Sequence, residues 1–259
     1  MRARLARAQA RLFPHGVWDV VRQVLLFALA YEAYSLVRGM TDDARGATVA
    51  FQHGRELIYL ERALHIFVEP SVQAWAQTKP AIIDTASWIY LNAQTTVTVC
   101  ALVFIYLAHN RQFYFVRNMM LVAMSLALIG YITFPAAPPR LFPEWGFIDS
   151  VSNFAGVSHK APVNDLFNPY AAVPSMHVAF SLMIGWTLAQ LCKHKAVRVF
   201  WALYPLLITF VIVSTANHFL SDAILGAMVA AFAAFAAHLL AQRRPAAWSF
   251  KPATATATA

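Results

Sequence analysis

Long apolar stretches alternate with short polar segments along this 259-residue chain, and they set its architecture. A helix needs roughly 17 to 25 predominantly apolar residues to cross a bilayer. Stretches that reach or approach this length cover residues 17–38, 86–108, 114–134, 176–192, 197–216 and 219–241. The pattern predicts an all-α fold, a polytopic membrane helix bundle of about six transmembrane helices plus an interfacial amphipathic helix.

The interfacial helix is predicted for residues 47–77, which read "ATVAFQHGRELIYLERALHIFVEPSVQAWAQ". Apolar residues recur there with a helical period, but five charged residues interrupt them: Arg55, Glu56, Glu61, Arg62 and Glu69. We therefore expect this segment to lie along the membrane surface rather than to cross it.

The first apolar stretch is the most polar, because it contains Asp19, Arg22 and Glu32. An Arg-rich start before an apolar run is also typical of a signal peptide. Since no small-residue cleavage site follows, we interpret the stretch as a membrane anchor.

The composition supports a membrane protein, with 59% hydrophobic and 12% charged residues, whereas about a quarter of the residues are charged in an ordinary soluble domain. The net charge is +8. The basic residues do not gather with aromatic residues into a patch for nucleic acid, so we expect no nucleic-acid partner.

The distribution of Lys and Arg beside the predicted spans indicates the orientation. Basic residues dominate the segments that are cytoplasmic when the N-terminus lies inside: Arg2, Arg4, Arg7, Arg11, Arg111, Arg117, Lys193, Lys195, Arg198, Arg243, Arg244 and Lys251. We expect an integral protein of a bacterial plasma membrane. Residues 1–16 form a basic cytoplasmic tail, 17–242 the membrane domain and 243–259 a disordered cytoplasmic tail.

Three polar stretches then fall on the extracytoplasmic side, at one depth: "FPAAPPRLF" (134–142), "NPYAAVPSMH" (168–177) and "STANHFLSD" (214–222). They come from three different places in the chain. Their convergence predicts one functional site facing outward.

The second stretch predicts a helix that starts beside His177. Ser175 is a typical N-cap residue, and the first backbone N–H groups of a helix, here near Ser175 and Met176, attract anions. The simpler interpretation is that Ser175 starts a helix and that His177 packs against a loop.

In the third stretch, His218 and Asp222 are four residues apart, so a helix places them on one face. A carboxylate can accept the imidazole N–H and leave the other ring nitrogen to act as a nucleophile or base. The alternative is a solvated pair at the end of a span.

The first stretch places Arg140 after a stiff proline run, and a guanidinium matches phosphate oxygens well. An anchor at the lipid head groups is the alternative. Asn168, Tyr170 and Asn217 are further candidates for the pocket lining, Asn217 among the phosphate-binding residues.

"PSMH" and "NHFLSDAILG" resemble the second and third motifs of the type 2 phosphatidic acid phosphatase superfamily. "FPAAPPRL" and "ERALHIFVEPSVQ" are similar to segments of its inositol phosphorylceramide synthase-like branch, the inositolphosphotransferases. The resemblance covers roughly residues 45–230. It implies a lipid phosphate substrate and no metal or other cofactor.

The resemblance also implies roles for individual residues. His218 would form a phospho-histidine, Asp222 would orient it, and His177 would protonate the leaving group. Ser175 would help to hold the phosphate, and Arg140 would be a cationic clamp.

This sequence departs from the phosphatase members of the superfamily in three places. It has no Lys before Arg140 in the preceding span, it has Val211 and Ile212 in place of Ser-Arg, and it has Met176 in place of a glycine. Fewer cations favour a phosphodiester over a phosphate monoester.

The sequence therefore predicts a membrane lipid phosphotransferase that moves a phosphoryl or phospho-head group, such as phosphoinositol, at the outer leaflet. One alternative is a phosphatase that hydrolyses phosphatidic acid or a prenyl diphosphate. Alternatives of other classes are a lipid transporter or scramblase, and a hydrolase with zinc on His177, His218 and Asp222.

Overall fold

A computed structural model describes residues 16–39, 44–156 and 170–245. Within these ranges the regular structure is helical, which confirms the predicted all-α class. The α-helices are α2 (Val17–Gly39), α3 (Ala44–Ala63), α4 (Glu69–Gln77), α5 (Pro80–Ala108), α6 (Asn110–Thr133), α7 (Ser150–Ala155), α8 (Met176–Leu191), α9 (Lys195–Ser214) and α10 (Leu220–Arg243). Two short 3-10 helices are η1 (Pro139–Leu141) and η2 (Pro143–Trp145). Both predicted tails lie almost entirely outside the described residues.

Four helices are long and apolar enough to cross a membrane, namely α5, α6, α9 and α10. They indicate an integral membrane protein. Helix α8 is apolar but has 16 residues, and α2, with its charged residues, is not among the four.

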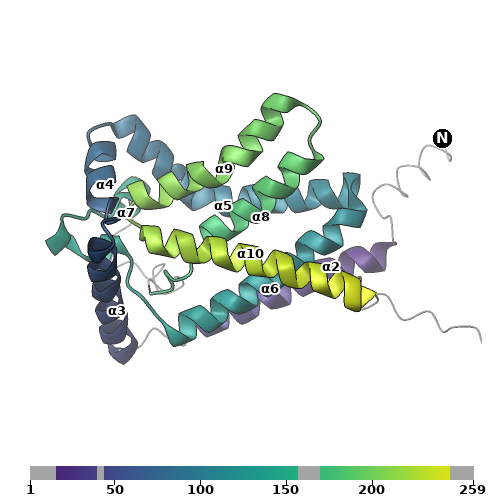
Figure 1. Ribbon diagram of the computed structural model, residues 1–259, viewed down its shortest axis with the longest axis horizontal. Helices are drawn as coiled ribbons and strands as arrows, with labels where there is room; N and C mark the ends of the chain where they lie inside the picture. The colour runs from purple at the N-terminus through teal and green to yellow at the C-terminus, as the bar shows by residue number, and fades with distance from the viewer. Residues whose placement is uncertain (1–15, 40–43, 157–169, 246–259) are drawn as a thin grey trace, which may run out of the picture.

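The long helices pack side by side into a bundle around α8 (Figure 1), which contacts α5, α6, α9 and α10. Helix α2 lies against α6 on the outside. Where α6, α8 and α10 meet, five of the fully buried residues are alanines: Ala123, Ala127, Ala179, Ala233 and Ala237. Small side chains let membrane helices approach closely, so van der Waals contact holds this crossing together.

Helices α3, α4 and α7 gather at one end of this bundle (Figure 1). The prediction of a single helix over 47–77 was wrong, because α3 ends at Ala63 and α4 begins at Glu69. His65 has a φ of 57°, and this left-handed conformation breaks a helix. Pro70 then stands in the first turn of α4, a position that suits proline.

Helix α3 packs on the three polar stretches through a small apolar cluster. Ala50 and Ile58 of α3 meet Phe142 of the proline-rich stretch, Val173 before α8 and Phe219 before α10. Apart from Val173, which is 5% exposed, these side chains are fully buried. The α3–α4 unit, defined as residues 44–77, therefore forms a cover over the end of the bundle where the three stretches meet.

A second polar cluster lies where α5 ends and α6 begins. Arg117, counted above among the cytoplasmic charges, is instead fully buried in α6. Its Nη1 donates to Gln23 of α2 at 2.8 Å, and its guanidinium lies over the Tyr114 ring. Asp19 accepts hydrogen bonds from the hydroxyls of Tyr106 and Tyr114. These contacts explain how the charged residues of α2 are accommodated against the bundle.

Candidate active site

His218 lies in the tight turn that joins α9 to α10. Ala216 in this turn has a φ of 54°, a left-handed conformation that is uncommon for a residue with a Cβ and that concentrates at functional sites. The N–H groups of Asn217 and His218 both bond back to the carbonyl of Ile212. The turn thereby fixes the backbone from which the His218 side chain projects.

The Nδ1 atom of His218 is flanked by two oxygen atoms. The carbonyl oxygen of Ala172 lies 3.0 Å away, and Oδ2 of Asp222 lies 3.3 Å away. A carbonyl oxygen can accept a hydrogen bond but cannot donate one, so Nδ1 carries the proton. In the neutral ring the nitrogen lone pair then lies on Nε2.

Asp222 is completely buried at the start of α10. Its Oδ2 also accepts the N–H of Phe219 at 2.9 Å, as an acidic residue in the first helical turn commonly does. These two bonds fix the carboxylate against His218. Its Oδ1 has no partner among the described residues.

His177 in the first turn of α8 lies beside His218, with 5.5 Å between the ring centroids and 61° between the planes. On its other face it stacks on Tyr90 of α5, with centroids 4.5 Å apart. Tyr90 therefore limits the rotation of the His177 ring. The fold therefore brings together the two imidazoles that the sequence singled out, one from α8 and one from the turn between α9 and α10.

The start of α8 approaches α10 closely. Ser175 precedes the helix, its N–H donates to the carbonyl of Asp222 at 3.0 Å, and its own carbonyl faces Gly226. A Cβ at Gly226 would collide with that carbonyl. Ser175 is fully buried, but its hydroxyl makes no capping bond, and Oγ has no partner within the described residues. Met176 at the first helical position is also buried.

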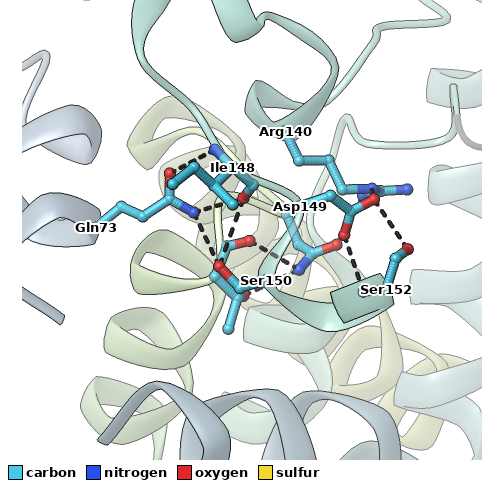
Figure 2. Close-up of polar contacts among 8 residues, drawn as sticks. Gln73, Arg140, Ile148, Asp149, Ser150 and Ser152 are labelled. Carbon is cyan, nitrogen blue, oxygen red and sulfur yellow. Dashed lines mark hydrogen bonds and ion pairs between the residues drawn. The ribbon is translucent and has the colours of Figure 1, made fainter. Parts of the chain in front are cut away.

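Arg140 is held from two sides, as Figure 2 shows in part. Its Nε lies 3.4 Å from Oδ2 of Asp149, and its Nη1 donates to Oδ1 of Asn217 at 2.7 Å. Its backbone N–H donates to the carbonyl of Ala216. Since Asn217 immediately precedes His218, these bonds connect the guanidinium to the turn of the candidate nucleophile.

The side-chain amide of Asn217 is already bonded within the protein. Its Nδ2 donates to the carbonyl and the hydroxyl of Thr215, and its Oδ1 accepts from Arg140. This arrangement gives Asn217 the task of holding Arg140. Tyr170 supplies a carbonyl to Ala136 in the proline-rich stretch. Asn168 lies outside the described residues.

A narrow pocket leads from His177 between α5, α8 and α9, with Tyr90, Gln94 and Ser181 among its lining residues. On the outer side of α5 and α9 lies an apolar groove of about 220 Å³. Both cavities are lined by Ile89 and Val211, so they adjoin. The groove is apolar and has room for part of a hydrocarbon chain beside the pocket at His177.

Sequence reasoning missed several residues that build this site. Tyr90, Ala172 and Asp149 carry no local signal, because each acts on a partner far away in the chain. Glu61 and Glu69 were counted among the charged residues that keep residues 47–77 at the membrane surface, whereas both are fully buried. The available signal was that each glutamate falls among the apolar positions of its helix and not on the polar face.

The chain was also compared with known proteins. Residues 55–237, most of the chain, match the PAP2 superfamily. No curated protein and no solved structure is detectably similar to it. The match contains both histidines, the aspartate and the arginine of the site. The chain therefore belongs to the PAP2 superfamily, and it is a membrane enzyme of the lipid phosphatase or phosphotransferase type.

Proposed function

We propose that this protein transfers a phosphoryl or phospho-head group from a lipid through a covalent intermediate on His218, without a metal. The observation that carries the proposal is the pair of acceptors at Nδ1 of His218, Ala172 and Asp222. They hold the proton on Nδ1 and leave Nε2 as the nucleophile. They also stabilise the positive charge that the ring gains when it attacks phosphorus.

In the first step, the Nε2 lone pair of His218 forms a bond to phosphorus, and the bond from phosphorus to the leaving oxygen breaks. His177, in its protonated form, gives its proton to that oxygen. In the second step, the hydroxyl of the acceptor attacks phosphorus while His177 takes its proton. The P–N bond breaks, and its electron pair returns to His218.

The phosphate oxygens would lie at the start of α8. The hydroxyl of Ser175, which has no partner among the described residues, and the N–H of Met176 are donors there, and the helix dipole favours an anion. Arg140 adds positive charge, and Asn217 keeps its guanidinium in place. Together these groups stabilise charge that grows on the phosphate oxygens in the transition state.

The substrate is a lipid whose chain occupies the groove between α5 and α9. The groove contacts Ala81, Thr85 and Leu207 and adjoins the pocket beneath His177. We further propose that α2 and α8 also cross the membrane, which gives six spans. Both termini are then cytoplasmic, and the site faces the extracytoplasmic side, covered by the α3–α4 unit.

The low number of cations favours a phosphodiester and an alcohol acceptor. Val211 and Ile212, which stand where phosphatase members carry Ser-Arg, are buried in the apolar interior. The resemblance to the inositol phosphorylceramide synthase-like branch stays a prediction, because the family match extends to the superfamily and no further.

The test uses the purified full chain in lipid nanodiscs with labelled phosphatidylinositol, phosphatidic acid or a prenyl diphosphate, each with and without a diacylglycerol or ceramide acceptor. We expect turnover that vanadate inhibits, and an acid-labile, base-stable phosphoenzyme after quenching. The variant H218A should lose both. Turnover or a phosphoenzyme that persists in H218A would overturn the proposal.

The same assay distinguishes the alternatives. Release of free phosphate from phosphatidic acid regardless of acceptor indicates a phosphatase. Loss of turnover in EDTA, restored by zinc, indicates a metal hydrolase on the same histidines. Lipid exchange between leaflets without any chemical change in the lipid indicates a transporter or scramblase.

A further inference from the structure

Two buried glutamates of the α3–α4 unit bind the first turn of α10. Oε1 of Glu69 accepts the N–H of Leu220, and Oε1 of Glu61 accepts the N–H of Ser221, each at 2.6 Å. Both glutamates are 0% exposed, so neither is a solvated surface charge. Asp222 accepts the N–H of Phe219. Carboxylates therefore accept three successive N–H groups, those of residues 219–221, at the N-terminus of α10.

The second carboxyl oxygens of Glu61 and Glu69 indicate that one of the two groups is protonated. Oε2 of Glu61 and Oε2 of Glu69 have no donor among the described residues. Their Oε1 atoms accept from the successive N–H groups of Leu220 and Ser221, so the two buried carboxyl groups lie close together, and burial and the neighbouring Glu61 raise the pKa of Glu69. Two ionised carboxylates offer acceptors only, so a bond between them requires that one carries a proton. Without the proton, two like charges would stand together in a buried place.

We propose that Glu61 and Glu69 are positioning residues that share one proton and thereby clamp the α3–α4 unit to the start of α10. The clamp holds His218 and Asp222 in line with His177. This inference rests on the proposed function, since it assigns a task within the same site.

The α4 helix contacts both the start of α10, next to His218, and the loop that holds Arg140. Along α4, Glu69 reaches α10, while Gln73 reaches the loop before α7. Gln73 bonds the carbonyl and N–H of Ile148 and the hydroxyl of Ser150, as Figure 2 shows. Between those two residues stands Asp149, which pairs with Arg140. Docking of α4 therefore positions Arg140, through Asp149, and His218, through the start of α10.

The shared proton makes the clamp sensitive to pH. Burial, and next the neighbouring Glu61, raise the pKa of Glu69 to about 8. Asp222 of α10, itself bonded to His218, also interacts electrostatically with Glu61. A carboxyl whose pKa is higher in the folded than in the unfolded state stabilises the fold fully at low pH. That contribution declines from about pH 4.5 and is lost by about pH 8, and the native clamp opens near the upper value.

Paired glutamine substitutions test the proton directly. In E69Q the amide oxygen still accepts the Leu220 N–H, and the NH₂ group donates to Glu61, so the clamp no longer needs a proton. E61Q does the same from the other side. In E61Q/E69Q two NH₂ groups face each other and neither can accept. The matched control is E56Q, an exposed glutamate on α3.

We expect wild type and E56Q to lose turnover as pH rises through about 8. Each single glutamine variant should lose less turnover than wild type across this range, because only the loss that comes from deprotonation of the general acid remains. The double variant should lose roughly tenfold or more at every pH, in line with the loss of helix caps at a site that needs exact geometry. Single variants that lose as much turnover at alkaline pH as wild type, or that are as impaired as the double variant, would overturn the clamp.

A second readout does not depend on catalysis. The melting temperature of wild type should fall between pH 5 and 8, and that of E69Q should change less over the same interval. If no lipid is turned over but this difference is present, the proposed function has failed and the shared proton stands. If lipids are turned over but the two melting curves share one pH dependence, the shared proton has failed.

Discussion

Oδ2 of Asp222 lies 3.3 Å from Nδ1 of His218 and accepts the N–H of Phe219 as well. The carboxylate is therefore fixed from two directions and cannot swing away when the imidazole becomes charged. A buried negative charge at this distance stabilises the imidazolium that forms during phosphotransfer.

The variant D222N should keep the fold and lose catalysis. Its amide has nearly the shape of the carboxylate, but it carries no charge to balance the phosphorylated ring. We expect kcat to fall about 100-fold or more, with a small change in KM. Steady-state kinetics on the best lipid checks this, with D84N on the exposed face of α5 as the control. Equal kcat in D222N and wild type would contradict a role in catalysis.

His177 can be tested through the leaving group. If it protonates the departing oxygen, H177A should lose about 100-fold or more on a lipid with an alcohol leaving group. On the nitrophenyl ester of the same lipid phosphate, whose leaving group needs no proton, the loss should stay within roughly tenfold. The ratio of kcat/KM values for the two substrates is the measurement. An equal loss on both would assign His177 to binding instead.

Hydropathy was enough to predict the long helices, because a membrane span must bury its whole backbone and most of its side chains in apolar surroundings. The spacing of His218 and Asp222 also predicted their contact, although His218 lies in the turn before α10 and does not share a helix face with Asp222. Both predictions depended on local periodicity. The break at His65 did not follow from it, because a left-handed histidine leaves no mark on the hydrophobic pattern.

Tertiary partners decided the remaining features. Glu69 accepts a hydrogen bond from Leu220 across 151 positions of the chain, and Arg117 reaches Gln23 across 94. Taken alone, each of these charged residues belongs in water or at an interface. They are buried because backbone N–H groups or amides supply the missing hydrogen bonds, and no local pattern contains that information.

Gly226 sets the distance between α8 and α10, so G226A should separate them. The added Cβ would meet the carbonyl of Ser175, which is backbone and cannot rotate away. We expect a loss of about 1–3 kcal/mol in stability, and a fall in turnover of roughly tenfold or more because the two histidines move apart. Thermal unfolding and kinetics in nanodiscs measure both. M228A on the exposed face of α10 is the control, and normal activity in G226A would contradict the close approach.

The polar cluster around Asp19 should matter for stability and leave the chemistry unchanged. In D19A the hydroxyls of Tyr106 and Tyr114 lose their acceptor while they remain buried. Each such loss costs about 1–3 kcal/mol. Unfolding by denaturant in detergent should show the loss, whereas turnover per folded molecule should equal wild type. E32A, an exposed site on α2, provides the comparison, and reduced turnover in folded D19A would link this cluster to the reaction.

The 16 residues of α8 give it a length of about 24 Å at the usual rise per residue. The hydrocarbon interior of a bilayer is about 30 Å thick. If α8 crosses the membrane, as proposed, a helix this short leaves His177 at its start below the head-group layer unless the bilayer is thinner there. The enzyme must thin the bilayer around α8 or draw the lipid phosphate downward. Turnover should therefore rise in membranes of shorter acyl chains, where that vertical displacement is smaller.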